Sequence, residues 1–305
     1  ASGVVAAAET HPDSLLLNAY AGILWMLLEA AEAPANAQAF LDRAQGLASR
    51  ASAREQAVVA MLAAWVADDV PEVLRLCDAI LADDPRDLLT AAFAHYHQFN
   101  RGDFPAMLRT MTRVLPHLDD VSEAHGMAAF AYEQCHLLDE AEAAARRALE
   151  LRAANPWAQH ALAHVMLTQG RIDEGAAFLE GRRAGWTGLN SFMLTHLWWH
   201  LALFRLSQGR GDEALAIYDD HAWAVAKDYS QDQIGAVSLL VRLELAGVEV
   251  GDRWDELGGW LAARAEDTLQ PFLTLQYLYG LARAGRPEAD RLLVAVRVEA
   301  ANAPD

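Results

Sequence analysis

Apolar residues recur along the chain at the spacing of helices, and no stretch alternates apolar and polar residues with the period of two that marks a strand. Glycine and proline gather mostly between the apolar segments, where helices begin and end. The pattern predicts an all-α protein without a sheet. We expect helices near residues 13–32, 36–49, 52–68, 71–83, 86–101, 104–116, 120–136, 139–152, 156–169, 172–185, 190–208, 212–227, 231–246, 252–265, 269–284 and 287–301.

An acidic phrase recurs between several of these helices, at residues 138–141, 170–175 and 209–214. Each copy places an aspartate near a helix N-terminus, a glutamate in the first turn, and a small residue where two helices can pack closely. The step from Asp139 to Asp173 is 34 residues, and the step from Asp173 to Asp212 is 39. A 34-residue step is the period of the tetratricopeptide repeat, in which one repeat is a pair of helices.

The predicted fold is therefore a tetratricopeptide-like α-α superhelical solenoid of paired antiparallel helices. We expect one helical-repeat domain over residues 1–305, with a possible subdivision near residue 118. In such a solenoid the first helix of each pair usually lines the concave groove, and the second faces outward.

Four histidines form two matched pairs, His160 with His164 and His196 with His200. The i, i+4 spacing places the two imidazoles of a pair on the same side of a helix, one turn apart. Counted from the glycines that end the two helices, the four positions span an arc of only about 100° and overlap in height. Since packed helices lie about 8–10 Å apart, the four imidazoles can converge.

This histidine cluster has three interpretations. Two i, i+4 pairs can supply three or four nitrogen ligands to a divalent transition metal such as zinc, copper, iron or nickel, although neither pair belongs to an HExxH signature. Alternatively, the imidazoles and neighbouring tryptophans line a pocket for an organic ligand. In the third interpretation the histidines are structural, with hydrogen bonds to each other, to the backbone or to water.

We expect a binding protein whose concave groove holds a peptide or a small organic ligand, because repeat solenoids offer extended binding surfaces. The candidate ligand-binding residues are His160, His164, His196, Trp199, His200, Trp157 and Tyr218. Trp198 and Trp199 are adjacent, so one should pack inward while the other faces the groove.

The alternative function is an enzyme of hydrolase or oxygenase type that uses the same histidines. Its catalytic residues would be His160 and His200, as metal ligands or as general acid and base, with Asp219 orienting one imidazole. A three-ligand metal site with one open position would suit such chemistry.

The stretch from Trp157 to Trp254 carries a string of motifs. They are Trp157-Ala158-Gln159-His160 with Ala163-His164, Gly170-Arg171 with Glu174-Gly175, His196 with Trp199-His200, Glu213-Ala214-Leu215 with Tyr218-Asp219, Arg242-Leu243-Glu244, Gly247, and Gly251-Asp252-Arg253-Trp254. This stretch resembles the tetratricopeptide-repeat protein 38 family, with weaker likeness from about residue 12 to residue 294. The resemblance implies a helical-repeat fold and draws attention to the histidine and tryptophan cluster, but it implies no activity.

Composition excludes several other classes. A net charge of −18 disfavours binding to nucleic acid or to an anionic membrane, and no apolar run approaches the length of a membrane helix. The chain has no GxSxG motif and no glycine-rich phosphate or dinucleotide loop, so we expect no nucleotide cofactor. Cys77 and Cys135 are the two cysteines and form no CxxC motif, which favours a reducing compartment such as the cytoplasm.

Overall fold

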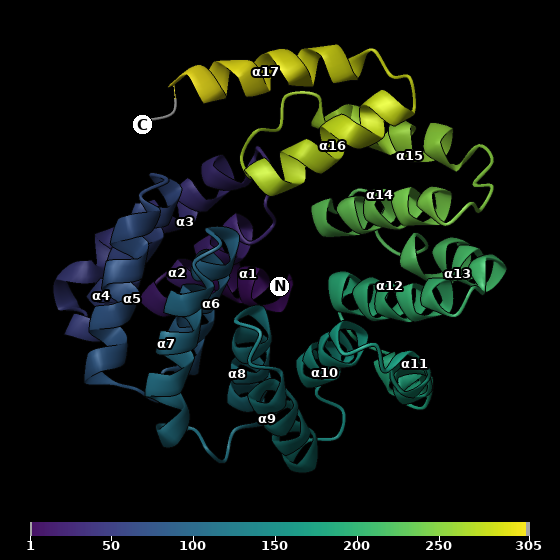
Figure 1. Ribbon diagram of the computed structural model, residues 1–305. Helices are drawn as coiled ribbons and strands as arrows, with labels where there is room; N and C mark the ends of the chain where they lie inside the picture. The colour runs from purple at the N-terminus through teal and green to yellow at the C-terminus, as the bar shows by residue number, and fades with distance from the viewer. Residues whose placement is uncertain (1, 303–305) are drawn as a thin grey trace. The chain divides into compact units, whose positions relative to one another are not determined.

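A computed structural model describes residues 2–302, which fold into seventeen α-helices and contain no β-strand (Figure 1). The prediction of an all-α fold is confirmed. All sixteen expected helices are present, and the additional helix, α1 (Ser2–Thr10), precedes the first of them. None of the described helices combines the length and the apolar character that a membrane span would need.

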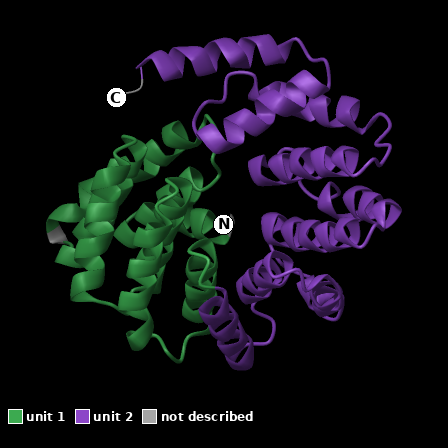
Figure 2. Cartoon of the chain, in the orientation of Figure 1, with its two compact units in different colours: residues 1–137 green, residues 138–305 purple. Residues whose placement is uncertain are grey.

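The chain divides into two compact units, residues 1–137 and residues 138–305 (Figure 2). The sequence suggested a soft boundary near residue 118, whereas this division follows Leu137, at the end of the turn after α8. Each unit is described separately below.

Unit 1 consists of helices that pack as consecutive pairs, α2 with α3, α4 with α5, and α6 with α7. One apolar core joins α2 to α6 and includes Ile23, Met61, Leu62, Trp65 and Phe93. The helices of this unit are α1, α2 (Leu15–Met26), α3 (Ala33–Leu47), α4 (Ala53–Val66), α5 (Val70–Asp83), α6 (Leu88–Asn100), α7 (Phe104–Val114) and α8 (Ser122–Gln134).

The core of unit 1 contains a histidine that should make its stability pH-dependent. The His97 side chain is 3% exposed and packs edge-on against Trp65, with ring centroids 4.3 Å apart. Burial, aided by the charge of Arg101, lowers the pKa of His97 to about 4. Because the folded-state pKa lies below the ordinary value near 6.5, the unfolded protein takes up a proton at His97 more readily than the folded protein does. The contribution of buried, neutral His97 to stability is therefore complete above pH 6.5 and is lost as the pH falls toward 4.

Between pH 7.5 and pH 4.5, we expect the free energy of unfolding to fall by about 2–3 kcal/mol less in His97→Leu than in wild type. Urea unfolding curves at the two pH values measure the difference. The exposed His117 provides the matched control, since His117→Leu should leave the pH dependence unchanged. Equal pH dependence in wild type and His97→Leu would contradict this assignment.

Unit 2 continues the pairing, and its first helices also contact one another in turn: α10 with α12, α12 with α14, and α14 with α16. Figure 1 shows α11 and α13 to one side of α10 and α12, so that first and second helices form separate layers. The helices are α9 (Leu138–Leu151), α10 (Pro156–Thr168), α11 (Ile172–Glu180), α12 (Ser191–Ser207), α13 (Gly211–Ile217), α14 (Ser230–Leu245), α15 (Arg253–Leu261), α16 (Pro271–Arg283) and α17 (Glu288–Asn302).

The repeat is also visible in the backbone, as residues in the left-handed (αL) conformation that recur just after helices. Their φ angles lie between 58° and 79°, and successive members are 34, 34, 34, 39, 38 and 38 residues apart. An αL residue at this position lets the amides that follow bond back to the last carbonyls of the helix. The series confirms the sequence period, and it aligns His136 with Gly170. Its members are Asp68, Gly102, His136, Gly170, Gly209, Gly247 and Gly285.

Helices α11, α13 and α15 end earlier than the sequence suggested. Helix α11 ends at Glu180, and a 3-10 turn follows at Arg183–Trp186. This turn carries Trp186 into the core, where the side chain is 1% exposed. Close packing of α11 on α12 requires the small residue predicted there, because a Cβ at Gly175 would lie 2.3 Å from the ring of Phe204.

Candidate metal centre

The two histidine pairs lie on neighbouring first helices whose starting points are fixed by side-chain caps. The side-chain Oδ1 of Asn155 accepts a hydrogen bond from the amide of Ala158 (3.1 Å), and Oδ1 of Asn190 accepts one from the amide of Met193 (2.8 Å). These caps satisfy amides that the first turn leaves without intrahelical partners. Fixed starting points also fix which side of each helix every later residue occupies.

The structure brings all four predicted imidazoles together, with their Nε2 atoms close to one another. The Nε2 atom of His160 lies 3.0 Å from that of His164 and 3.0 Å from that of His196. The Nε2 atom of His200 lies 3.2 Å from that of His196. All four ligand atoms lie within 4.8 Å of one another. Helix α10 supplies one pair and helix α12 the other.

Hydrogen bonding among these nitrogens accounts for only part of the arrangement. A neutral Nε2 has either one proton to donate or one in-plane lone pair to accept with. The close contacts run from His164 to His160, then to His196 and to His200, so the two middle nitrogens each take part in two contacts. With one proton or one lone pair per nitrogen, at most two of the three contacts are good hydrogen bonds. A shared cation, in contrast, accepts one lone pair from every Nε2 atom.

The distances and protonation states fit a transition-metal ion. Tetrahedral coordination with metal–nitrogen bonds of about 2.0–2.1 Å separates the ligand nitrogens by about 3.3 Å. The close Nε2 contacts of 3.0–3.2 Å need only small adjustments to reach that value, while the more distant pairs, which lie within 4.8 Å, must move closer. Burial lowers the pKa of His160 and His200 well below 6.5 and that of His196 to about 3, with neighbouring histidines adding to the effect. Neutral imidazoles at pH 7 have the free lone pair that a metal requires.

Aromatic side chains hold the imidazoles in place. The His196 ring lies between Phe192 and Trp199, stacked on both with centroid distances of 5.1 and 5.4 Å. Trp157 meets His160 edge-on at 5.8 Å. Trp198 points elsewhere, as expected for the neighbour of Trp199, and packs against other aromatic rings. These aromatic contacts therefore restrict the movement of the imidazole rings.

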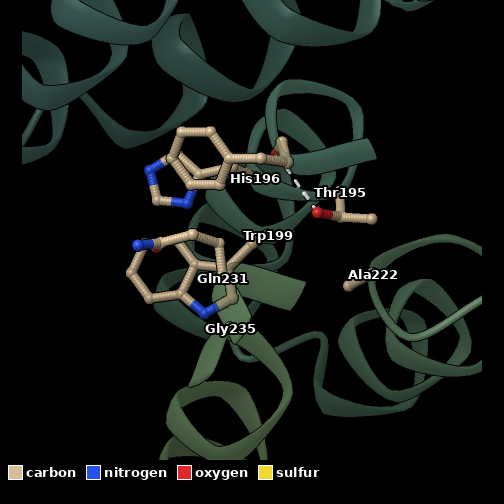
Figure 3. A pocket seen from close by; sticks show the side chains of 7 residues that line it. Thr195, His196, Trp199, Ala222, Gln231 and Gly235 are labelled. Atoms are coloured by element: carbon tan, nitrogen blue, oxygen red, sulfur yellow. Dashed lines mark hydrogen bonds between the residues drawn. The ribbon is translucent and has the colours of Figure 1, made fainter. Parts of the chain in front are cut away.

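A very small pocket of about 10 Å³, enough for about one water molecule, adjoins the cluster on the side of His196. Figure 3 shows His196, Trp199 and Gln231 grouped together, with Thr195 and Ala222 across from them. The remaining lining residues are Phe192 and Gly235. Helix α14 contributes Gln231 and Gly235, so the pocket lies between α12 and α14.

Two residues predicted for the site are not part of the cluster. Tyr218 is 1% exposed, in a π-helical turn after α13, and burial raises the pKa of its hydroxyl. Asp219 forms a two-pronged ion pair with Arg253 at 2.7 and 2.6 Å. In the described residues neither side chain forms a hydrogen bond, ion pair or ring contact with the four histidines, so an orienting role for Asp219 remains a prediction.

Sequence reasoning missed part of the pocket lining. Phe192 and Thr195 share α12 with the second histidine pair, and their i, i+4 and i, i+1 spacing to His196 was the available signal. Gln231 and Gly235 lie on α14 and gave no such signal, because their proximity depends on how α14 packs against α12.

Comparison with known proteins shows the fold and no more. No family model matches the chain. A crystal structure of a tetratricopeptide repeat protein from Parabacteroides merdae is similar over 89% of this chain and 99% of that one, with a TM-score of 0.57 and 13% identity. The P58(IPK) TPR domain matches over 93% of this chain and 80% of that one, with 14% identity and a TM-score of 0.28, too low to support an argument. The chain is thus a tetratricopeptide-like helical-repeat protein in fold.

Proposed function

We propose that this protein binds one divalent transition-metal ion through His160, His164, His196 and His200. The observation that carries the proposal is the convergence of four Nε2 atoms within 4.8 Å, which hydrogen bonds among them explain only in part. Neutral imidazole nitrogens suit zinc, copper, iron and nickel, whereas magnesium and calcium prefer oxygen ligands. The ion would link two successive repeats, because each contributes one pair of ligands.

Titration of metal-free, untagged protein with Zn²⁺ tests the proposal. We expect one equivalent to bind, and a Co²⁺ derivative to show the absorption of a nitrogen-ligated ion. The double variant His160→Ala/His200→Ala should weaken binding by more than about a hundredfold, since even loss of a single outer-shell partner weakens metal binding by about 10–100-fold.

The control is His221→Ala, which removes a histidine of the same unit that stacks on Trp198 instead of joining the cluster. This variant should bind the ion like wild type. The proposal would be refuted if wild type bound no equivalent of Zn²⁺ tightly, or if the double variant bound Zn²⁺ with unchanged affinity.

A peptide- or small-molecule-binding role is the second candidate, because Trp157, which meets His160 edge-on, is 43% exposed. Helical-repeat proteins commonly present binding surfaces on their first helices. Enzymatic use of the cluster, and membership of the tetratricopeptide-repeat protein 38 family, stay predictions at the level of the sequence.

A further inference from the structure

The last helix pair of unit 2 exposes a row of large apolar side chains. Phe272, Leu275 and Tyr279 follow one another on α16 at intervals of three and four residues, and their exposed fractions are 62%, 58% and 47%. This spacing places all three on one side of the helix. On α17, Val294 and Val298 are also exposed, at 59% and 53%. Because monomeric proteins rarely leave large apolar side chains gathered in this way, the α16 row indicates a contact surface.

The repeat shows what this side of a first helix does elsewhere in unit 2. Leu275 lies ten residues before the αL glycine that follows its helix, as do His160 on α10 and Val237 on α14. His160 is 3% exposed and Val237 is 1% exposed, against 58% for Leu275. The imidazole of His160 meets His196 of the next first helix. A Cβ on Gly280 of α16 would lie 2.9 Å from the side chain of Val237.

On α10 and α14, therefore, the following first helix covers this position. Figure 1 shows α10, α12, α14 and α16 in succession, and each of them contacts the next. The α16 row continues that series of interfaces, but within the described residues no helix covers it. A helix of the same repeat type is thus the kind of structure that fits the row.

Charge favours a second copy of this chain as the source of that helix. The whole chain has a net charge of −18, whereas residues 271–302 carry four arginines and three acidic residues and have a net charge of +1. Two copies therefore repel each other on average, but not where these helix pairs meet. A near-neutral apolar surface is also complementary to itself, which a dimer of identical chains requires.

The distribution of exposed apolar side chains favours a two-fold dimer over a head-to-tail series of copies. A head-to-tail contact needs a second, different surface to receive the α16 row. Among the described residues, helices α1 to α5 expose no large apolar side chain, and α1 already packs against α2 and buries Ala8. A two-fold contact uses one surface twice, so the α16 row is sufficient for it.

We propose that two copies of this protein associate through α16 and α17, with the two α16 rows packed against each other about a two-fold axis. The two helix pairs then form a four-helix bundle, much as successive helix pairs pack together within the chain. Leu275 is the middle residue of the row, so in the dimer it meets its counterpart in the second copy. This surface is independent of the metal centre, whose ligands lie on α10 and α12.

Sedimentation equilibrium of the untagged protein, from about 1 to 100 µM, tests the proposal. We expect the mass of wild type to rise with concentration from 33.3 kDa toward twice that value. Leu275→Glu should weaken association about a hundredfold, because a tenfold loss at the centre of the interface counts once in each copy. Leu245→Glu is the matched control, since Leu245 is 83% exposed at the end of α14 and lies outside the α16 row. This control should associate like wild type.

A mixture of two variants tests whether the α16 rows face each other. Leu275→Glu and Leu275→Lys should each lose association, because like charges meet at the two-fold axis, whereas an equal mixture should form a heterodimer. Circular dichroism should show wild-type helix content in both, since glutamate and lysine are good helix formers at an exposed position. A dimer that survives Leu275→Glu, or a mixture that stays monomeric, would overturn the proposal. A monomeric wild type at every concentration would also overturn it and would leave the α16 row for a helix of a different protein.

Discussion

Removal of bound metal with a chelator is expected to lower the midpoint of thermal unfolding by about 8–16 °C. His160 and His196 are 36 residues apart in sequence, so the four-nitrogen site exists only when α10 and α12 pack together. An ion that binds the folded state alone stabilises it by about 4 kcal/mol at a free concentration one thousand times its Kd. For a unit of this size each kcal/mol shifts the midpoint by about 2–4 °C.

Thermal unfolding followed by circular dichroism, with excess Zn²⁺ or with chelator, measures this effect. The double variant His160→Ala/His200→Ala should unfold at the same temperature in both conditions, whatever its own midpoint is. His221→Ala should keep the full response of wild type. If wild type binds one equivalent of Zn²⁺ yet unfolds at one temperature in both conditions, the ion does not couple the two helices in the way proposed.

The meeting of the four histidines was predictable because the repeat fixes both the rotation and the height of each residue. The glycines Gly170 and Gly209 end α10 and α12 in the same αL conformation, with φ of 71° and 72°. Counting residues back from these glycines shows that the histidines of α10 and α12 lie on matching sides of their helices, without any knowledge of tertiary contacts. The Nε2 distances themselves depend on side-chain rotamers and on the spacing of the helices, which the period does not determine.

Other features depend on packing that a single segment of sequence does not encode. Helix α1 lies outside the recurring phrase and was not expected. The segment 218–222 forms a π-helical turn and not the continuation of α13, and its Asp219 binds Arg253, 34 residues away. The place of Arg242 over Trp199 likewise follows from the contact of α14 with α12. Local periodicity predicts helices well, but contacts across three helices require the structure.

Trp186 is expected to contribute more to the stability of unit 2 than any exposed tryptophan. Its side chain is 1% exposed, its indole Nε1 donates to Oε1 of Gln159 at 2.8 Å, and its ring meets Trp198 at 5.2 Å. Trp186→Ala should reduce the free energy of unfolding by about 3–5 kcal/mol, through lost burial and the cavity that remains. Trp186→Phe should fall between this variant and wild type, because it keeps an aromatic ring but leaves the buried Gln159 oxygen without this donor.

Urea unfolding of metal-free protein measures these changes without a contribution from the ion. The matched control is Trp260→Ala, because Trp260 is 43% exposed and its Nε1 bonds to the surface residue Glu256 at 3.1 Å. That change should cost less than about 1 kcal/mol. Gln159 directly precedes His160 on α10, so Trp186→Ala should also weaken Zn²⁺ binding, whereas Trp260→Ala should not. A Trp186→Ala variant as stable as Trp260→Ala would show that the 3-10 turn does not anchor α10 to α12.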